Sequence, residues 1–257
     1  MFMNESDRNK IWLKMDRRRR MVEPKSFRTM VTALQRAIQP FRDALSGYSF
    51  IADAAELAPS KIKRSEIEAG YLRLYQDVMP LFANRSYDDA MKGLKADATL
   101  REVWQDRVRD YVTVTLEPRI TQVTLTIEKR VRELVLQGVK EGMSVSELAQ
   151  NIDTLGLEEI ITNRSRVIAR TETINASNKG SLMGAEATGL SLKKEWIASL
   201  DGRERIAHAE AAERYQRDPI DLKADFIVDG EALQYPGDPS GSAGNIIQCR
   251  CTQAFVT

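Results

Sequence analysis

The sequence is poor in cysteine and histidine and lacks long hydrophobic runs. Its two cysteines, Cys249 and Cys251, are separated by one residue, where a disulfide would be badly strained, so we expect reduced thiols. No apolar run approaches the roughly 20 residues of a bilayer-spanning helix. The first ten residues, MFMNESDRNK, lack the apolar stretch of a secretory signal. These absences predict a soluble protein that is made in a cytoplasm.

Catalytic signatures are also scarce. The chain holds a single histidine, His208, and contains no Gly-rich phosphate loop, no His-Glu-x-x-His pattern and no paired Cys-x-x-Cys pattern. A nucleophile, a base and a group to orient the base are therefore hard to assemble, which argues against an enzyme. With 257 residues, of which 42% are hydrophobic and 29% charged, the chain is long and apolar enough to fold around a core.

Charge is unevenly distributed along the chain, although the net charge is only +1. Residues 1–30 carry nine Lys and Arg against four acids, whereas residues 200–257 carry ten acids against six bases. Terminal segments whose net charges have opposite signs are common in proteins that assemble with other components.

The basic N-terminal segment contains a run of four consecutive arginines, Arg17, Arg18, Arg19 and Arg20. Trp12 lies shortly before this run. Three interpretations remain open for this run. It contacts DNA phosphates, it docks on an acidic partner surface with Trp12 as an anchor, or it is a solvated helix face.

Apolar periodicity predicts that the first two thirds of the chain are helical. The pattern predicts helices over about residues 27–45, 60–82 and 104–134. Ser26 has the character of an N-cap for the first of these helices. The β-branched residues at 112–115, together with Pro118, predict a kink in the third helix.

Helical patterns continue to about residue 187, and short strand and turn patterns follow from Leu190. Residues 144–147, Ser-Val-Ser-Glu, form a capping-box pattern at the start of a short helix, and a longer helix is expected over about 158–187. Short strands are predicted over 193–199 and 225–228, and residues 246–256 could close a small sheet.

These patterns predict a mostly α fold with a C-terminal α+β domain. We expect an elongated helical N-terminal arm over residues 1–142, followed by a compact domain with a small antiparallel sheet over residues 143–257.

Short motifs follow one another in the C-terminal part of the chain. They are IARTETINASNKG at 168–180, KEW at 194–196, DGRER at 201–205 with His208, FIVDGE at 226–231, YPGDPSGSAGN at 235–245 and Cys-Arg-Cys at 249–251. Each motif alone is weak, but the ordered set resembles the phage Mu protein F-like minor head proteins, a head-morphogenesis family of tailed bacteriophages. The family usually has Asn directly before Cys-Arg-Cys, and Gln248 stands there instead.

The resemblance implies a virion component and no established catalytic activity. It implies a minor capsid protein, present in few copies, that acts in head assembly, DNA packaging or DNA delivery. Its expected place is inside the head near the portal vertex, and the host cytoplasm during assembly. The portal protein is the expected partner, bound through apolar faces around Leu34 and Leu74. The major capsid protein, a scaffold and packaged DNA are further candidate partners, and no membrane is expected.

Two alternative functions stay open beside the capsid protein. One is a DNA-binding ejection or packaging factor, and the other is a zinc-dependent enzyme. Salt-dependent retention on DNA favours the first alternative, and metal content with hydrolytic activity favours the second.

His208, Cys249 and Cys251 are the candidate metal ligands, because imidazole and thiolate are the ligands that zinc prefers. On a regular strand the two cysteines would point to opposite faces, and a fourth ligand is lacking unless Asp201 or a water supplies it. The alternative, which the sequence favours, is that the cysteines pack as small apolar side chains. The sequence establishes no cofactor, and zinc is the candidate.

A second polar set comprises Arg170, Glu172, Asp201 and Arg203, which we expect to form a buried network between the long helix and the sheet. Arg170 and Glu172 are two residues apart and face different directions on a helix, so each needs a partner elsewhere. The Arg-Thr-Glu sequence also suggests a transferase such as an ADP-ribosyltransferase, but no second motif supports that interpretation.

Overall fold

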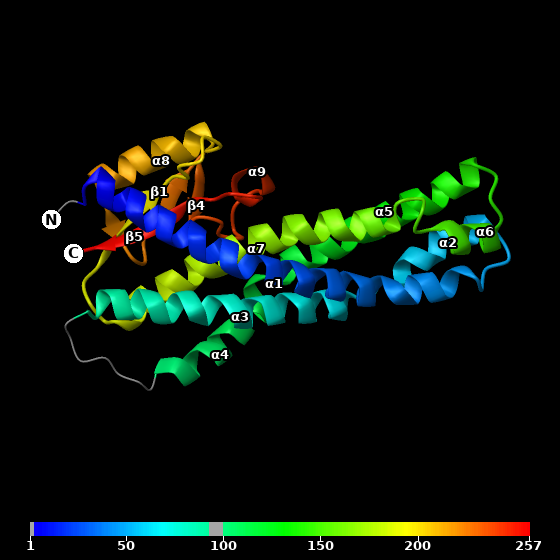
Figure 1. Ribbon diagram of the computed structural model, residues 1–257, viewed down its shortest axis with the longest axis horizontal. Coiled ribbons are helices and arrows are strands. Elements are labelled where there is room, and N and C mark those ends of the chain that lie inside the picture. Colours follow the sequence, from blue (N-terminus) through cyan, green and yellow to red (C-terminus); the bar gives the residue numbers. More distant parts are fainter. Residues whose placement is uncertain (1–2, 93–99) are drawn as a thin grey trace. The chain divides into compact units, whose positions relative to one another are not determined.

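The computed structural model describes residues 3–92 and 100–257, which are mostly helical (Figure 1). Residues 1, 2 and 93–99 of the predicted arm lie outside the described residues. The α-helices are α1 (Glu5–Leu45), α2 (Ile51–Leu57), α3 (Arg64–Ala90), α4 (Leu100–Asp110), α5 (Glu117–Lys140), α6 (Val145–Asn151), α7 (Leu157–Ala187), α8 (Ile206–Arg217) and α9 (Ala243–Ile246). The strands are β1 (Lys193–Ile197), β2 (Ile220–Asp221), β3 (Phe226–Val228), β4 (Glu231–Leu233) and β5 (Thr252–Val256).

The described residues form two compact units. The first unit takes its residues from 3–26, 74–92, 100–110 and 169–257, and the second from 27–73 and 111–168. The predicted fold class, mostly α with small antiparallel sheets near the C-terminus, is confirmed. The division of the chain between residues 142 and 143 stays a prediction.

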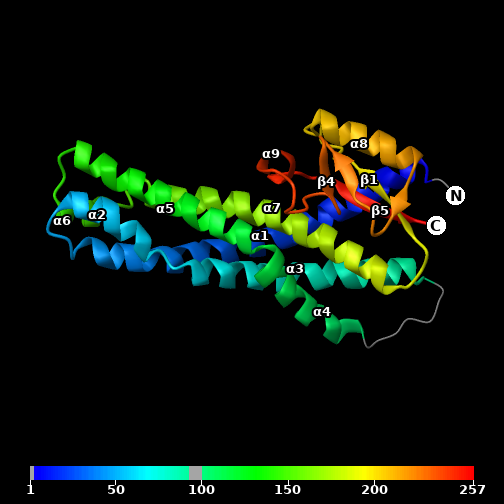
Figure 2. The same ribbon diagram turned by 180° about the vertical axis from the view of Figure 1, so that it is seen from behind.

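The first unit contains a three-stranded antiparallel sheet in the order β2-β1-β5. Side chains alternate across β1: Trp196 joins the core formed with α8, whereas Ile197 packs with Trp12 of α1. Helix α8 and the first turns of α1 therefore cover opposite faces of the sheet, as can be followed in Figures 1 and 2. On the α1 face, Glu195 is buried and accepts a hydrogen bond of 2.8 Å from Nε of Arg8.

A β-hairpin lies beside this sheet in the first unit. Strands β3 and β4 pair through the two-residue turn Asp229-Gly230, whose φ angles are 51° and 76°. Two consecutive positive φ angles are typical of a type I′ turn, for which Asp-Gly is a preferred sequence. The sequence pattern predicts β3 but not its partner β4.

The second unit is built from helices. Helix α5 buries one face, formed by Ile120, Val123, Ile127, Val131 and Leu134. Arg42 of α1 binds Asp153 at 2.7 Å and Glu158 at 2.6 Å. Leu34 is fully buried here, and Leu74 of the first unit is 1% exposed. The expectation that apolar faces around these two leucines bind a portal protein is therefore wrong.

Helix α1 begins far upstream of the predicted N-cap. Ser26 lies inside the helix and its Oγ donates to the carbonyl of Val22, so it is not an N-cap. The helix continues because its buried face extends upstream through Trp12, Met15 and Arg19 at helical spacing. An arginine occupies one of those buried positions, which is why apolar periodicity alone placed the start of the helix too late.

The helix predicted over residues 104–134 is interrupted just before Pro118, in the region where the sequence predicts a kink. Residues Tyr111–Thr115 form a π-helical turn between α4 and α5, and the amide of Leu116 donates to the carbonyl of Tyr111. Pro118 lies in the first turn of α5, where its missing N–H costs no intrahelical hydrogen bond. The predicted capping box is confirmed, because Ser144 and Glu147 exchange hydrogen bonds at the start of α6.

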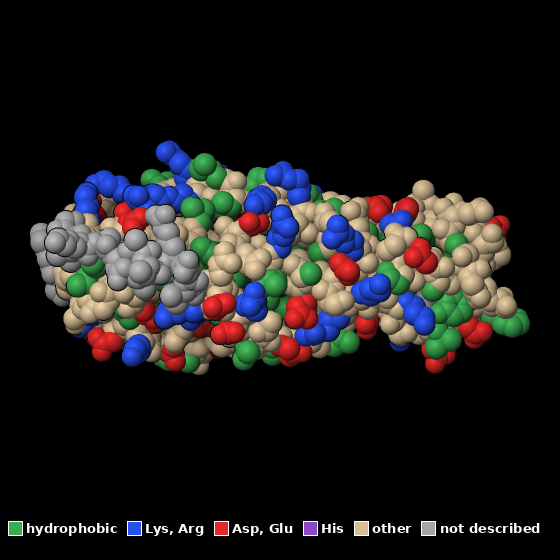
Figure 3. All heavy atoms as spheres, turned by 90° about the horizontal axis from the view of Figure 1, so that it is seen from below, with side chains coloured by type: hydrophobic (Ala, Val, Ile, Leu, Met, Phe, Trp, Pro, Cys, Tyr) green, Lys and Arg blue, Asp and Glu red, His purple; other side chains and the backbone are tan. Residues whose placement is uncertain are grey.

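Surface charge is mixed on the face drawn in Figure 3, where Lys and Arg side chains are interspersed with Asp and Glu. Among residues 3–92 and 100–257, no helix combines the length and the apolar character needed to cross a membrane.

Candidate metal centre

Helix α8 presents His208 to the core of the first unit. Its buried face consists of His208, Ala211, Ala212 and Tyr215, and the His208 ring packs edge-on against Trp196 at 5.4 Å between centroids. Arg205, at the start of the helix, donates to the carbonyl of Ile247 at 2.7 Å. These contacts fix where α8 begins and hence where its histidine points.

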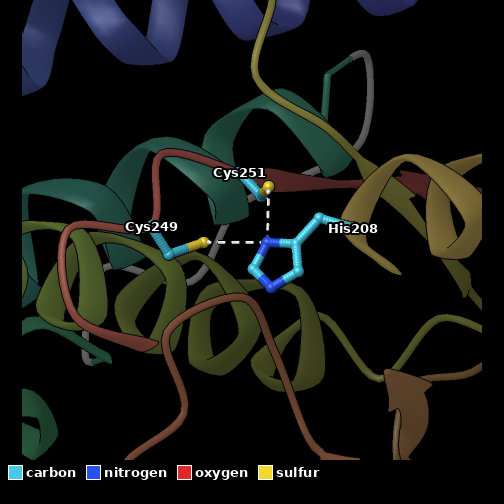
Figure 4. A group of neighbouring side chains, drawn as sticks. All are labelled: His208, Cys249 and Cys251. Carbon is cyan, nitrogen blue, oxygen red and sulfur yellow. Dashed lines mark hydrogen bonds between the residues drawn. The ribbon is translucent and has the colours of Figure 1, made fainter. Parts of the chain in front are cut away.

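The two cysteines lie in the loop between α9 and β5. Just before them, Gln248 has a φ of 56°, and its amide donates to Oγ1 of Thr171 at 3.2 Å. Because Cys249 and Cys251 are outside a regular strand, the alternation expected on a strand does not apply. Both thiols reach the His208 ring (Figure 4).

The ligand atoms of the three predicted residues all lie within 4.8 Å of one another, and all three residues are buried. Nδ1 of His208 is 3.3 Å from Sγ of Cys251 and 3.6 Å from Sγ of Cys249. The structure therefore brings together the candidate set that the sequence offered as metal ligands.

A chain of amide and carboxylate groups orients the other side of the ring. Nε2 of His208 lies 2.7 Å from Oδ1 of Asn245, while the Asn245 amide nitrogen donates to the carbonyl of Val228 at 3.0 Å and to Glu231 at 3.1 Å. Because the amide nitrogen donates to two oxygens, Oδ1 is the acceptor and Nε2 carries a proton. Nδ1 is therefore the ring nitrogen that faces the sulfur atoms.

Proton affinities in the cluster are strongly perturbed. The hydrogen bond from Cys251, together with His208, lowers the pKa of Cys249 well below its ordinary value, despite burial. Burial first, and then Cys249, raise the pKa of Cys251 well above its ordinary value. Burial lowers the pKa of His208, but its contacts with Cys249 and Asn245 outweigh burial and leave that pKa raised. The cluster therefore favours loss of the proton from Cys249 before loss of the proton from Cys251.

A small cavity of about 240 Å³ adjoins the cluster. The three candidate ligands line it together with Ser199, Arg203, Glu204, Arg205, Gln248 and Arg250. Asp201, which the sequence left open as a fourth ligand beside a water, is not among these residues, and its carboxylate pairs with the guanidinium of Arg250.

The predicted polar network does not form as one group. Arg170 binds Glu23 at 3.1 Å, and buried Glu172 accepts a hydrogen bond of 2.7 Å from the Tyr75 hydroxyl. Asp201 pairs with Arg250, and Arg203 is exposed at the cavity. Arg170 and Glu172 do find separate partners, as their spacing on the helix requires.

The arginine run is divided between surface and interior. Arg17 and Arg20 are exposed and Arg18 is half-buried, but Arg19 is only 4% exposed. Trp12 is buried too, and its indole donates to the carbonyl of Arg250 at 3.1 Å. Neither Arg19 nor Trp12 is available for the predicted contact with DNA or a partner, because both side chains are buried in the first unit.

Sequence reasoning missed the residues that support the cluster, Asn245 and Glu231. A signal was present, because each ends one of the short motifs, YPGDPSGSAGN and FIVDGE. A third motif contributes Asn178, whose amide nitrogen donates to the carbonyl of Cys251 at 3.1 Å. The motifs that are separate in sequence thus meet around the Cys-Arg-Cys loop.

Comparison with known proteins gives one family and a distant relative. Residues 129–254 match the family described as phage Mu protein F like protein. An NAD(+)–arginine ADP-ribosyltransferase named EFV, from Enterococcus faecalis, is 26% identical over 144 residues. The match covers 55% of this chain and 28% of that protein, so the chain spans less than a third of this relative's length. No solved structure matches the chain.

Proposed function

Because residues 129–254 belong to the phage Mu protein F-like family of phage head proteins, we propose that this protein is a minor capsid protein that docks on the portal. The observation that carries the proposal is the family match, which spans all the motifs that meet around the Cys-Arg-Cys loop. The docked protein lies inside the head near the portal vertex and acts in head assembly, DNA packaging or DNA delivery.

The environment of Glu172 supports a role without catalysis. It is 1% exposed inside α7, and the hydroxyl of Tyr75 donates to its carboxylate. A transferase that used Arg170-Thr171-Glu172 would need this carboxylate to reach a substrate, and here it is inside the core. The similarity to the ADP-ribosyltransferase covers a small part of that enzyme and does not transfer its activity.

An exposed face of α1 is the docking surface that the described residues support best. Leu13 is 57% exposed and Met21 is 76% exposed, and Arg17 and Arg20 lie between them at helical spacing. Methionine and arginine are enriched at protein interfaces, and exposed apolar side chains rimmed by charge mark binding surfaces. We assign these four residues, named the α1 stripe, to contact with an acidic area of the portal.

Co-purification tests the α1 stripe. The double variant Leu13→Glu with Met21→Glu should lose most capture by co-expressed portal protein, because it places negative charge on the apolar part of the surface. Val114→Glu is the matched control, since Val114 is 74% exposed in the π-helical turn and outside the stripe. Capture that the double variant leaves unchanged contradicts the docking surface.

Purified phage heads test the function itself. The protein should be present in few copies, counted by quantitative mass spectrometry against portal subunits in the same heads. Its absence from intact heads contradicts the proposed function, whatever the α1 stripe does.

A DNA-binding packaging or ejection factor is the second candidate. The observation in its favour is that Arg17 and Arg20 stay exposed beside half-buried Arg18. Such a factor would show DNA binding that weakens steeply with salt, because each neutralised phosphate releases a counterion.

A further inference from the structure

We propose that His208, Cys249 and Cys251 bind one zinc ion and that a water molecule completes the tetrahedron. The inference concerns how the first unit is held together, and it does not depend on whether the protein docks on the portal. It rests on the positions of the ligand atoms, the orientation of the imidazole, the burial of the thiols and the adjoining cavity.

The distances between ligand atoms fit a tetrahedral zinc site. Typical Zn–S and Zn–N bonds with a tetrahedral angle between them place nitrogen and sulfur about 3.6 Å apart. In the structure Nδ1 of His208 is 3.3 Å from Sγ of Cys251 and 3.6 Å from Sγ of Cys249. The two sulfur atoms lie within 4.8 Å of each other, and a tetrahedral zinc ion would hold them about 3.8 Å apart. A metal ion at bonding distance from all three atoms therefore requires modest side-chain adjustments.

The imidazole is oriented as a metal ligand. Histidine ligands usually donate their second ring N–H to a carbonyl or carboxylate group, which fixes the ring and the nitrogen that binds the metal. Here Nε2 faces Oδ1 of Asn245 at 2.7 Å, and Asn245 is itself held by Glu231 at 3.1 Å. This arrangement leaves Nδ1 directed at both sulfur atoms, where a single hydrogen bond could satisfy only one of them.

Charge gives a reason for a cation at this place. Cys249 and Cys251 are 2% and 1% exposed, so two ligand thiolates would be costly to bury without the positive charge that a metal ion brings. Zinc with two thiolates and a neutral imidazole has no net charge. The backbone amide of Ser199 also hydrogen-bonds Cys251. Sulfur and imidazole ligands together are typical of zinc rather than of magnesium or calcium.

The fourth coordination position is supplied from the cavity of about 240 Å³ that the three ligand residues line. A cavity of this size has room for water. Zinc bound in this way would connect α8 to the loop before β5, two segments about 40 residues apart, so its main effect is on the stability of the first unit.

Metal analysis of the untagged full chain tests the proposal. Protein purified without chelator should contain about one zinc per chain by elemental analysis. Removal of the metal and titration with Co²⁺ should produce thiolate-to-cobalt charge-transfer absorption, which reports cysteine coordination directly. A chelator should lower the melting temperature of the zinc-bound protein. Cys249→Ser and His208→Ala should each abolish stoichiometric binding.

Two further variants separate ligation from general damage to the fold. Asn245→Ala keeps all three ligands and should weaken zinc binding roughly 10-fold to 100-fold, since it frees the imidazole. Arg203→Ala changes an exposed residue of the same cavity and should leave zinc binding unchanged. If the wild-type chain holds no zinc, gives no charge-transfer absorption with Co²⁺ and melts identically with chelator, the proposal is wrong. The Co²⁺ titration of the wild-type chain tests metal binding by the cysteines even where a variant fails to fold.

Discussion

Arg19 donates a hydrogen bond of 2.6 Å from Nη2 to Oδ1 of Asn178, and thereby ties α1 to α7 inside the first unit. The same guanidinium donates to Ser177 at 2.7 Å and to the carbonyl of Cys251 at 3.3 Å. Burial lowers the pKa of Arg19 to about 10, which leaves it charged at neutral pH. An arginine within a run of four is therefore a buried structural residue.

Replacement of Arg19 should be strongly destabilising. Arg19→Met retains most of the volume but leaves the acceptors on Asn178 and Cys251 without their donor, at an expected cost of about 3–5 kcal/mol. Arg20→Met is the matched control, because Arg20 is exposed and pairs with Asp16 on the same helix, and it should cost less than about 1 kcal/mol. Urea denaturation of both variants measures the difference, and equal costs would contradict the structural role.

Helices α3 and α7 approach each other at two glycines. A Cβ on Gly184 would overlap the carbonyl oxygen of Ala83, and a Cβ on Gly180 would overlap that of Met79. Gly184→Ala should therefore cost about 1–3 kcal/mol, because a backbone cannot move aside as a side chain can. Gly244→Ala is the control, since its new Cβ would meet only Oγ of Ser242, at an ordinary contact distance of 3.7 Å. A stability change at Gly184 as small as the control's would show that the helices can separate freely.

Gln248 occupies a backbone conformation that suits asparagine better. Its φ of 56° lies in the left-handed region, which asparagine adopts more readily than glutamine. The structure thus gives a physical reason for the asparagine that the family usually has before Cys-Arg-Cys. Gln248→Asn should raise the free energy of unfolding by about 0.5–1 kcal/mol, as thermal or chemical denaturation can measure. A loss of stability in this variant would contradict the prediction. It would mean that a contact of the longer glutamine side chain stabilises the fold by more than its left-handed backbone conformation destabilises it.

Local sequence patterns predicted the parts of the fold that depend on neighbouring residues. The capping box at Ser144 and Glu147 and strand β1 depend on near neighbours in the sequence, and both are confirmed. The β-branched residues at 112–115 likewise lie where the α-helix is interrupted by a π-helical turn. The hairpin turn Asp229-Gly230 was equally local, but its strands of three residues are too short to show clear alternation.

The missed features depend on contacts between residues far apart in the sequence. The sequence named His208 and both cysteines as candidate ligands, but Asn245 and Glu231 come to support this cluster only when the hairpin and α9 fold beside α8. Likewise, Arg19 is indistinguishable from Arg20 by residue type, and only the positions of Ser177 and Asn178 opposite it explain its burial.

Lys194 should give the protein an unusual alkaline pH dependence. Burial lowers its pKa from 10.5 to about 8, and its ammonium group donates to the carbonyl of Gln234 at 2.5 Å. Between pH 8 and about 10.5 the unfolded chain holds the proton more strongly than the folded chain, so the free energy of unfolding rises with pH across this window.

Chemical denaturation at several pH values checks this dependence. The contribution of Lys194 to the rise should be on the order of 2–3 kcal/mol, and Lys194→Met should lack it. Lys193→Met, at the exposed neighbouring position, should keep the wild-type profile. Profiles of wild type and Lys194→Met that stay parallel from about pH 7.5 to 10.5 would show that Lys194 titrates normally.

Salt dependence of DNA binding distinguishes a DNA-binding factor from a protein that only docks on the portal. Arg17 and Arg20 are the exposed members of the arginine run. If both arginines bind phosphates, Arg17→Ser with Arg20→Ser should reduce the slope of log affinity against log salt by about two, one for each phosphate that is no longer neutralised. The matched control is Arg28→Ser with Arg36→Ser, which removes the same charge from exposed positions further along α1. Equal slopes for the two double variants would assign Arg17 and Arg20 to the protein-docking role or to solvent, because general loss of positive charge would then account for the whole effect.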